Sequence, residues 1–137
     1  METVAEQHPE HAMWPRDAAT RACARSVSME MHAGFADLRA KMPMEIHTCA
    51  PGKGAAAESL PSIARVEAIW SECLERSGGP FLFGEFGIAD AMFAPVVTRF
   101  NSYSPVLSDA SRAYCERVTQ LPVVAEWIDG ARKELAR

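Results

Sequence analysis

Residues 84–95, GEFGIADAMFAP, contain the start of a helix. If Gly87 is the last residue before that helix, Asp90 is its third residue, and the Asp90 carboxylate can accept a hydrogen bond from the Gly87 amide. This bond is one half of a capping box, and Phe86 stands where an apolar side chain packs on the first turns as a hydrophobic staple. Pro95 lies too deep for the free first turn, so we expect it to remove one backbone hydrogen bond and kink the helix. The stretch therefore predicts a helix with a defined start.

A first long helix is predicted on the N-terminal side, over residues 17–42. Asp17 can accept hydrogen bonds from the unpaired amides of its first turn, and Pro43 stops it. Between these two residues, apolar side chains recur with the spacing of one helix face. They are Ala19, Cys23, Val27, Met31, Phe35, Leu38 and Met42.

A second long helix follows a loop rich in glycine, alanine and proline, residues 44–57. Ser59 is expected to cap this helix, and Pro61 is tolerated in a first turn whose amides lack partners. Gly78 and the glycine after it are expected to end the helix, because the backbone turns left-handed there.

Two more helices are predicted to start at Ser108 and Pro122, and a short helix over residues 2–7 leads into a connector anchored by Trp14. Four apolar residues of the last helix share a face that we expect to be buried: Val124, Trp127, Ile128 and Ala131. Since helical spacing runs through nearly the whole chain, the predicted fold is all-α, a helical bundle of about five helices.

The composition excludes several classes of partner. The chain has 137 residues, the size of one domain, and a formal net charge of −4. Sequence-independent nucleic-acid binding needs a basic surface, so no nucleic-acid partner is expected. The sequence has no run of 18 apolar residues and no export pattern at its N-terminus. We therefore expect a cytoplasmic location and no membrane partner.

No metal site is predicted. The four cysteines lie far apart and form no closely spaced pair of the kind that zinc sites use. Cys23, Cys73 and Cys115 fall inside expected helices, where a free thiol behaves as a small apolar group. His8 and His11 share a segment flanked by proline, and we interpret both as surface residues. Cys49 lies in the 44–57 loop close to His47, and a nucleophilic pair of these two remains an alternative.

Three longer stretches carry a resemblance to a known family. Residues 79–100 (GPFLFGEFGIADAMFAPVVTRF) and 121–134 (LPVVAEWIDGARKE) resemble the C-terminal helical domain of a bacterial cytosolic glutathione transferase. Residues 21–47 (RACARSVSMEMHAGFADLRAKMPMEIH) resemble the first helix of that domain. The resemblance extends over roughly residues 9–135. The family usually has Ser or Thr where this chain has Gly87, a change that costs only a few tenths of a kcal/mol.

The resemblance implies a division of the chain. Members of the family begin with a thioredoxin-like half that binds glutathione and carries the residue that activates its thiol. Residues 1–14 are similar only to the last helix of that half and the linker, and residues 15–137 to the helical domain. We therefore expect a truncated chain with no catalytic residue. No cofactor is expected to be bound by this chain alone, and glutathione is the co-substrate of the full-length family enzyme.

The same resemblance implies that the helical domain forms a hydrophobic wall for an apolar electrophilic small molecule. Five residues occupy the corresponding positions: Met31, Phe35, Arg39, Phe100 and Tyr103. In the alternative interpretation, Met31 and Phe35 belong simply to the core. Arg39 and Arg99 are then solvated charges, although either could steer an anionic substrate group. Tyr103 would offer an aromatic face with a polar tip.

In the family, the first long helix packs on the thioredoxin-like half and on a second subunit. We therefore expect a contiguous apolar patch on this helix and, as partner, a second copy in a homodimer or a thioredoxin-like domain or chain. Three functions follow as hypotheses. The chain is part of a detoxifying enzyme that conjugates glutathione, a non-catalytic protein–protein interaction module, or a helical binder of an apolar small molecule that works without glutathione.

Overall fold

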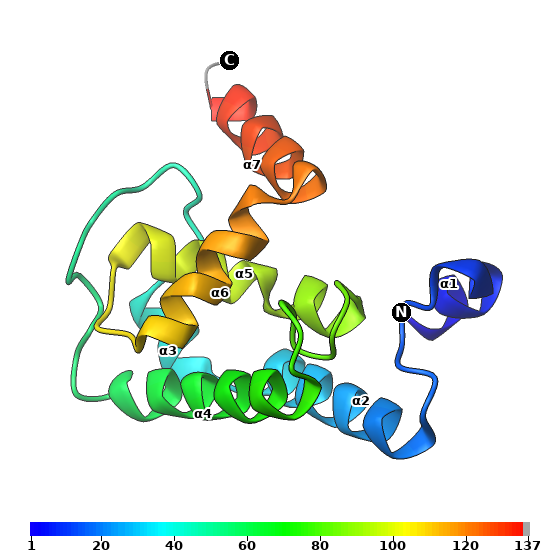
Figure 1. The fold of residues 1–137 in the computed structure, drawn as a ribbon. Helices are drawn as coiled ribbons and strands as arrows, with labels where there is room; N and C mark the ends of the chain where they lie inside the picture. Colours follow the sequence, from blue (N-terminus) through cyan, green and yellow to red (C-terminus); the bar gives the residue numbers. More distant parts are fainter. Residues whose placement is uncertain (136–137) are drawn as a thin grey trace. The chain divides into compact units, whose positions relative to one another are not determined.

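The helices of the protein begin and end close to the capping and breaking residues of the sequence. The computed structural model describes residues 1–135, and over these residues the chain forms seven α-helices and one short 3-10 helix (Figure 1). In chain order they are α1 (Glu2–Gln7), η1 (Pro9–His11), α2 (Ala18–Ala33), α3 (Ala36–Lys41), α4 (Leu60–Ser77), α5 (Ile88–Tyr103), α6 (Asp109–Gln120) and α7 (Pro122–Leu135). Five of the α-helices are longer than six residues. Outside helices, strand-like pairing in the described residues is limited to isolated bridges within residues 81–85. The predicted all-α fold class is confirmed.

Side chains set several of the helix starts. The Asp17 carboxylate accepts a hydrogen bond from the Thr20 amide at 2.8 Å in front of α2. The Ser108 hydroxyl accepts one from the Ser111 amide at 3.3 Å in front of α6. Both starts are where the sequence predicts them, because the cap and its partner lie only three residues apart. The predicted end of α4 is also confirmed, since the helix ends at Ser77 and the next residue is a glycine in the left-handed conformation (φ 62°).

The predicted helix over residues 17–42 is wrong as a single element. It breaks at Gly34 and Phe35 into α2 and α3, with Phe35 in the left-handed conformation (φ 61°). The Gly34 amide still donates to the Glu30 carbonyl at 2.8 Å, which closes the last turn of α2. A Cβ atom on residue 34 would lie only 2.7 Å from that carbonyl oxygen, so glycine permits this ending. The apolar stripe continues past the break and therefore conceals it.

The predicted buried face of the last helix is only partly correct. Val124 is buried, and Ile128 and Ala131 are half-buried, but Trp127 is 40% exposed. Val123, one turn before Trp127, is 64% exposed. Helix α7 follows α6 after a single residue, Leu121, and on the predicted face only Val124, in the first turn, is buried. Helical spacing correctly places these residues on the helix, but it cannot show that a partner for their face is present.

Contacts within the chain define two compact units, which we describe separately. The first comprises Met1–Gly34 and Ile69–Phe93, and the second comprises Phe35–Ala68 and the chain from Ala94 onward. In the first unit the fully buried Trp70 packs edge-to-face on Phe93, with 5.9 Å between the ring centroids. Trp14, the predicted anchor of the connector, is 8% exposed. The core of the second unit is formed by apolar side chains, among them Leu38, Met42, Val66, Val97, Tyr114 and Val118.

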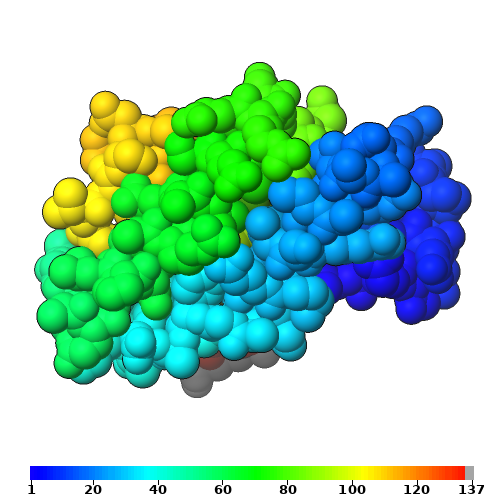
Figure 2. Space-filling model, turned by 90° about the horizontal axis from the view of Figure 1, so that it is seen from below, coloured from blue at the N-terminus to red at the C-terminus, as the bar shows by residue number. Residues whose placement is uncertain are grey.

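The 44–57 loop is bonded to the end of α5 within the second unit. The Ala50 amide donates to the Ser102 carbonyl and the Gly52 amide to the Tyr103 carbonyl, both at 2.7 Å. The Ser102 hydroxyl donates back to the Glu45 carbonyl at 3.0 Å. The last carbonyls of a helix have no partner within the helix, and here the loop supplies one for two of them. The loop also lies beside α3 on the face shown in Figure 2.

None of the described helices combines the length and the apolar character that a membrane crossing requires.

Candidate functional site

Arg99 is a buried cation in the second unit. Its side chain is 7% exposed, and its two hydrogen bonds both go to backbone carbonyls. Nε donates to Met42 at 2.9 Å and Nη1 donates to Pro95 at 2.9 Å. Met42 is the residue that ends α3, so the guanidinium neutralises the negative end of that helix. The interpretation of Arg99 as a solvated charge is wrong, because its acceptors are carbonyls buried with it.

Arg39 lies close enough to Arg99 to affect it electrostatically. Burial lowers the pKa of Arg99, and the charge of Arg39 lowers it further, while Tyr103 acts in the opposite direction. Burial also raises the pKa of Tyr103, and the Glu45 carboxylate raises it further. The buried Tyr103 phenol therefore lies between opposite charges, those of Glu45 and Arg99, and the charge of Arg39 acts on Arg99.

Phe35 and Arg39 are the accessible pair among the five predicted wall residues. Both are half-buried, and they lie one turn apart at the start of α3, where the Arg39 amide donates to the Phe35 carbonyl at 3.0 Å. Phe100 and Tyr103 are 3% and 1% exposed, so both belong to the core. Met31 is also buried, in the first unit. Four of the five residues are thus in one unit, and two of these four present side chains to solvent.

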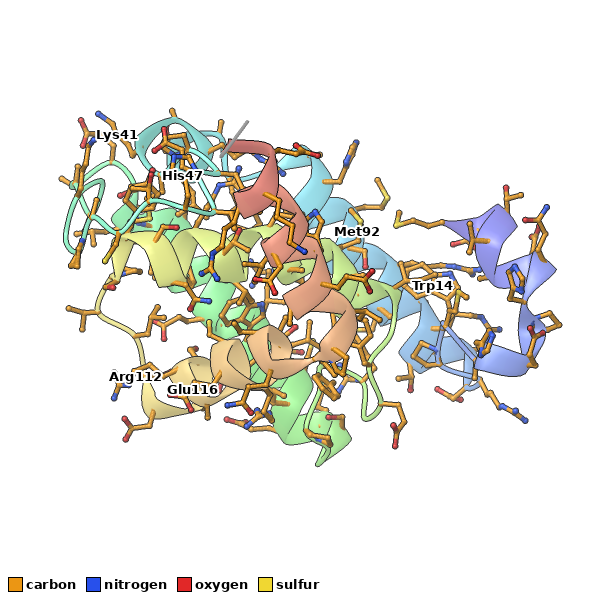
Figure 3. All side chains as sticks on the ribbon, turned by 90° about the horizontal axis from the view of Figure 1, so that it is seen from above. Trp14, Lys41, His47, Met92, Arg112 and Glu116 are labelled. Carbon is orange, nitrogen blue, oxygen red and sulfur yellow. The ribbon has the colours of Figure 1, made fainter. Side chains whose placement is uncertain are left out.

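A polar cavity of about 240 Å³ lies in the same unit, between the 44–57 loop and helices α5, α6 and α7. Its lining includes His47, Cys49, Thr98, Asn101, Thr119 and Arg132. The Asn101 side-chain amide donates to the Thr119 hydroxyl at 2.9 Å and joins α5 to α6. His47 and Lys41 lie at the same end of this unit (Figure 3). Sequence reasoning missed this cavity, although polar residues at 98, 101 and 102 on the otherwise apolar α5 are a signal for it.

The four thiols differ in environment. Cys49 is exposed on the loop and lines the same cavity as His47, so the structure brings the two residues of the alternative nucleophilic pair to one place. Burial raises the pKa of Cys73 to about 12, and burial also raises the pKa of Cys115 to about 12. A thiol must lose its proton to act as a nucleophile, so the two buried cysteines are chemically inert near neutral pH.

The start of α5 in the first unit is organised by Asp90, which is fully buried. One carboxylate oxygen accepts from the Gly87 amide at 3.0 Å, and the other accepts from the Leu82 amide at 3.0 Å. The first bond is the half of a capping box that the sequence predicts. The second bond requires the 79–86 turn to fold back on the helix. The Phe86 ring packs edge-to-face on Phe81 with 5.5 Å between centroids. Asp90 thus fixes both the turn and the helix.

The close approach of the connector backbone also favours glycine at position 87. The Ile88 amide donates to the Met13 carbonyl at 3.1 Å, which brings the connector against the helix start. A Cβ atom on residue 87 would lie 2.9 Å from that carbonyl oxygen. The same region borders a cavity of about 370 Å³ in the first unit, lined among others by His11, Trp14, Arg16 and Glu85. Close backbone approach therefore explains the glycine better than its capping ability does.

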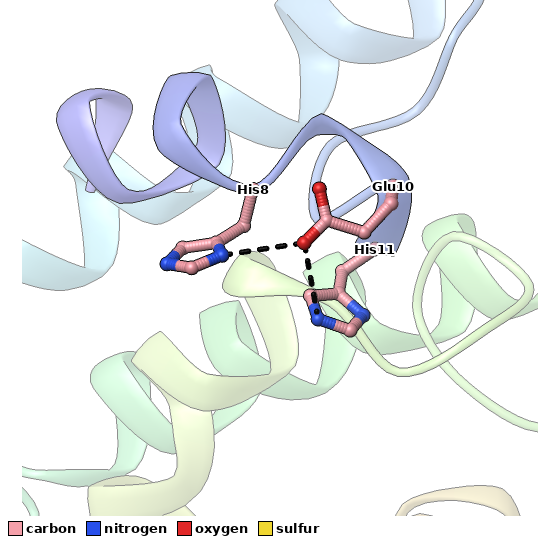
Figure 4. Close-up of side chains that lie close together, drawn as sticks. All are labelled: His8, Glu10 and His11. Carbon is pink, nitrogen blue, oxygen red and sulfur yellow. Dashed lines mark hydrogen bonds and ion pairs between the residues drawn. The ribbon is translucent and has the colours of Figure 1, made fainter.

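His8, Glu10 and His11 converge on the connector of the first unit (Figure 4). Nδ1 of His8 lies 3.3 Å from Oε1 of Glu10, and Nε2 of His11 lies 3.5 Å from the same oxygen. Both histidines are exposed, as the sequence predicts, but their approach to Glu10 was not predicted. The spacing of His8, Glu10 and His11 around Pro9 is the sequence signal from which this group could have been predicted.

Comparison with known proteins identifies the family. A family model described as "Glutathione S-transferase, C-terminal domain" matches residues 53–130, which are 78 of the 137 residues. The match includes α4, α5, α6 and most of α7. A comparison with curated proteins finds no match. Since the matched region is more than half of an all-α chain, the protein belongs to the glutathione S-transferase family and contains its C-terminal domain.

Proposed function

We propose that this chain forms the helical, co-substrate-binding part of a glutathione transferase. Its task is to hold an apolar electrophile while a thioredoxin-like half binds glutathione and activates the thiol. We expect it to act in the cytoplasm, where the glutathione pool is kept reduced. The observation that supports this role most is the pair Phe35 and Arg39 at the break between α2 and α3.

The conformation of Phe35 is the first step of the argument. A left-handed conformation costs a non-glycine residue about 1 kcal/mol or more, and such strain concentrates at binding sites. Here the conformation places an aromatic ring in a half-buried position at the start of α3. An apolar electrophile can stack on that ring.

Arg39 supplies the second step. It is half-buried one turn after Phe35, and the buried Arg99 beside it contributes a second positive charge. Electrophiles that react with thiolates often carry nitro, carbonyl or carboxylate oxygens, which a guanidinium can bind by hydrogen bonds. We assign Phe35 to stacking and Arg39 to orientation, and Phe100 and Tyr103 to the rigid core of the same unit.

The chemistry of thiol activation is assigned to the other half. Catalysis requires a group that stabilises the thiolate of glutathione. Of the thiols in the chain, Cys73 and Cys115 are held protonated, and neither they nor Arg99 lie where a tripeptide could reach. We therefore expect the purified chain to bind an apolar electrophile but to leave the rate of glutathione conjugation at the buffer blank.

Calorimetry with a dinitrobenzene-type electrophile, in the absence of glutathione, tests the assignment. Phe35→Ala and Arg39→Ala should each weaken binding several-fold. Val106→Ala is the matched control, since Val106 is an apolar residue of the same unit that is 94% exposed. Binding that the first two substitutions leave unchanged contradicts the site. Conjugation well above the blank contradicts the division of labour.

A second candidate function, a non-catalytic protein–protein interaction module whose partner is a second copy of the chain, is favoured by α7. The exposed pair Val123 and Trp127 is one turn apart on this helix and forms a small apolar surface. The patch expected on the first long helix is not found, because Met29 is the single large apolar side chain exposed on α2. Sedimentation at micromolar concentration tests this function. A dimer that Trp127→Arg dissociates supports it, and a monomer at all concentrations contradicts it.

A further inference from the structure

The connector between α1 and α2 carries three exposed side chains that point to one place. The ligand atoms of His8, Glu10 and His11 all lie within 4.8 Å of one another (Figure 4). Both imidazoles approach the same carboxylate oxygen, Oε1 of Glu10, at 3.3 Å and 3.5 Å. Two ring nitrogens and one oxygen therefore form a triangle that opens to solvent.

The backbone holds this triangle in place. Pro9 starts the 3-10 helix η1, and the fixed φ of proline suits a first helical position. The His11 amide donates to the His8 carbonyl at 3.2 Å, so the two histidines are one 3-10 turn apart, and side chains three residues apart eclipse one another in this geometry. Ala12 then leaves the turn in the left-handed conformation (φ 45°). The convergence follows from local geometry that four residues determine.

We propose that His8, Glu10 and His11 form a binding site for a divalent transition-metal cation, with Zn²⁺ as the best fit. Two imidazole nitrogens and one carboxylate oxygen are a ligand set that Zn²⁺ uses in sites that keep a fourth position open. Bond lengths of about 2.0–2.1 Å in tetrahedral geometry place neighbouring ligand atoms about 3.3–3.4 Å apart. The two separations that involve Glu10 already have this value within 0.2 Å.

The charge of the site favours a divalent cation over an anion or a monovalent cation. One carboxylate and two neutral imidazoles carry a net charge of about −1, which a divalent cation more than neutralises. Imidazole nitrogen also selects zinc, copper, nickel and cobalt over calcium and magnesium, which prefer oxygen ligands. The side chains are 52%, 59% and 65% exposed, so their rotamers can adjust to shorten the third edge, which is at most 4.8 Å. His11 also borders the cavity of the first unit, where the open fourth position can take water.

The experiment uses the full chain without an affinity tag, because tag histidines bind the same metals. Cys49→Ser is introduced first, since Cys49 is exposed and thiolates bind soft metals. Calorimetry with ZnCl₂ should then give one bound ion per chain, and titration with CoCl₂ should give the intense visible bands of a low-symmetry, tetrahedral ion. His8→Asn and His11→Asn should each weaken zinc binding by at least ~10-fold, because the loss of an outer-shell partner alone costs that much and these residues are direct ligands.

Matched variants keep the proposal falsifiable. Glu10→Gln removes the negative ligand at constant size and should also weaken binding, whereas His47→Asn changes an exposed histidine elsewhere and should not. All four positions are exposed, so circular dichroism should show unchanged helix content. The site does not exist if wild-type protein binds no zinc, if the His8 and His11 variants bind as tightly as the parent, or if His47→Asn abolishes binding.

Discussion

The amide of Leu82 donates a hydrogen bond to the buried carboxylate of Asp90 at 3.0 Å, across eight residues of chain. The other oxygen of that carboxylate accepts from Gly87, so a single side chain closes the 79–86 turn and starts α5. A capping carboxylate usually serves the helix alone. Here it also fixes the segment in front of the helix, and the loss of Asp90 removes both constraints together.

Asp90→Ala should therefore be strongly destabilising. It leaves two amides without an acceptor, one of them buried, and each such group costs about 1–3 kcal/mol. We expect the free energy of unfolding to fall by about 2–5 kcal/mol, measured by urea denaturation followed by circular dichroism. Asp109→Ala is the matched control, because Asp109 also lies in a first helical turn but its side chain is 96% exposed. A loss for Asp90→Ala as small as that for Asp109→Ala contradicts this account.

The two bonds of Asp90 show how far the sequence alone can lead. The bond to Gly87 joins residues three apart, and helical geometry predicts it. The bond to Leu82 depends on how the turn packs, which no local spacing contains. Arg99 is similar: its Nε donates to Met42 across 57 residues, so its burial could not be foreseen. Local rules locate helix starts, whereas the acceptors of long side chains require the tertiary structure.

The errors in the predicted helices have a common cause. The apolar stripe from Met31 to Met42 fits one continuous helix, and the single glycine at position 34 is weak evidence against it. The same reasoning assigns Trp127 to a buried face, because periodicity reports which residues share a face and not what covers it. The group of His8, Glu10 and His11 is local, but its convergence depends on the 3-10 turn that Pro9 starts.

Gly87→Ser should not stabilise the protein, although serine is the better helix cap. The gain expected from the cap is only a few tenths of a kcal/mol, whereas the new Cβ atom would lie 2.9 Å from the Met13 carbonyl oxygen. We expect a loss of about 1 kcal/mol, the lower end of the cost of overpacking. Gly130→Ala is the comparison, since a Cβ atom there meets nothing within 4 Å and α7 gains about 1 kcal/mol of helix propensity. Thermal unfolding measures both effects: the melting temperature should fall for Gly87→Ser and rise for Gly130→Ala. A rise in the melting temperature of Gly87→Ser contradicts the packing argument.

The thiols should react in the order of their exposure. With an aromatic disulfide reagent, native protein should release one equivalent of chromophore rapidly, from Cys49, because the other cysteines are half-buried or buried. All four cysteines should react once urea unfolds the chain. Cys49→Ser should remove the rapid phase and leave the slower ones. A rapid phase that survives this substitution contradicts the assignment of the fast-reacting thiol to Cys49.

Stability should fall as the pH rises above 9. Burial raises the pKa of Cys73 and of Cys115 from 9.0 to about 12. Between these two values the unfolded chain has lost protons that the folded chain retains, so the unfolded state is favoured increasingly as the pH rises. Each thiol contributes up to about 1.4 kcal/mol of lost stability per pH unit in this window and nothing well below pH 9. Tyr103, whose pKa burial also raises from 10.0, steepens the decline at the upper end.

Urea denaturation at a series of pH values from 7 to 11 measures this slope. The double variant Cys73→Ala, Cys115→Ala should be less stable at pH 7, because it loses two buried sulfur atoms, but its stability should decline less steeply above pH 9. The two curves should therefore converge as the solution becomes alkaline. Parallel curves contradict the argument, since they would mean that both thiols ionise equally well in the folded and unfolded chain. Because the comparison rests on a difference in slope, the cavity that the substitutions leave does not affect it.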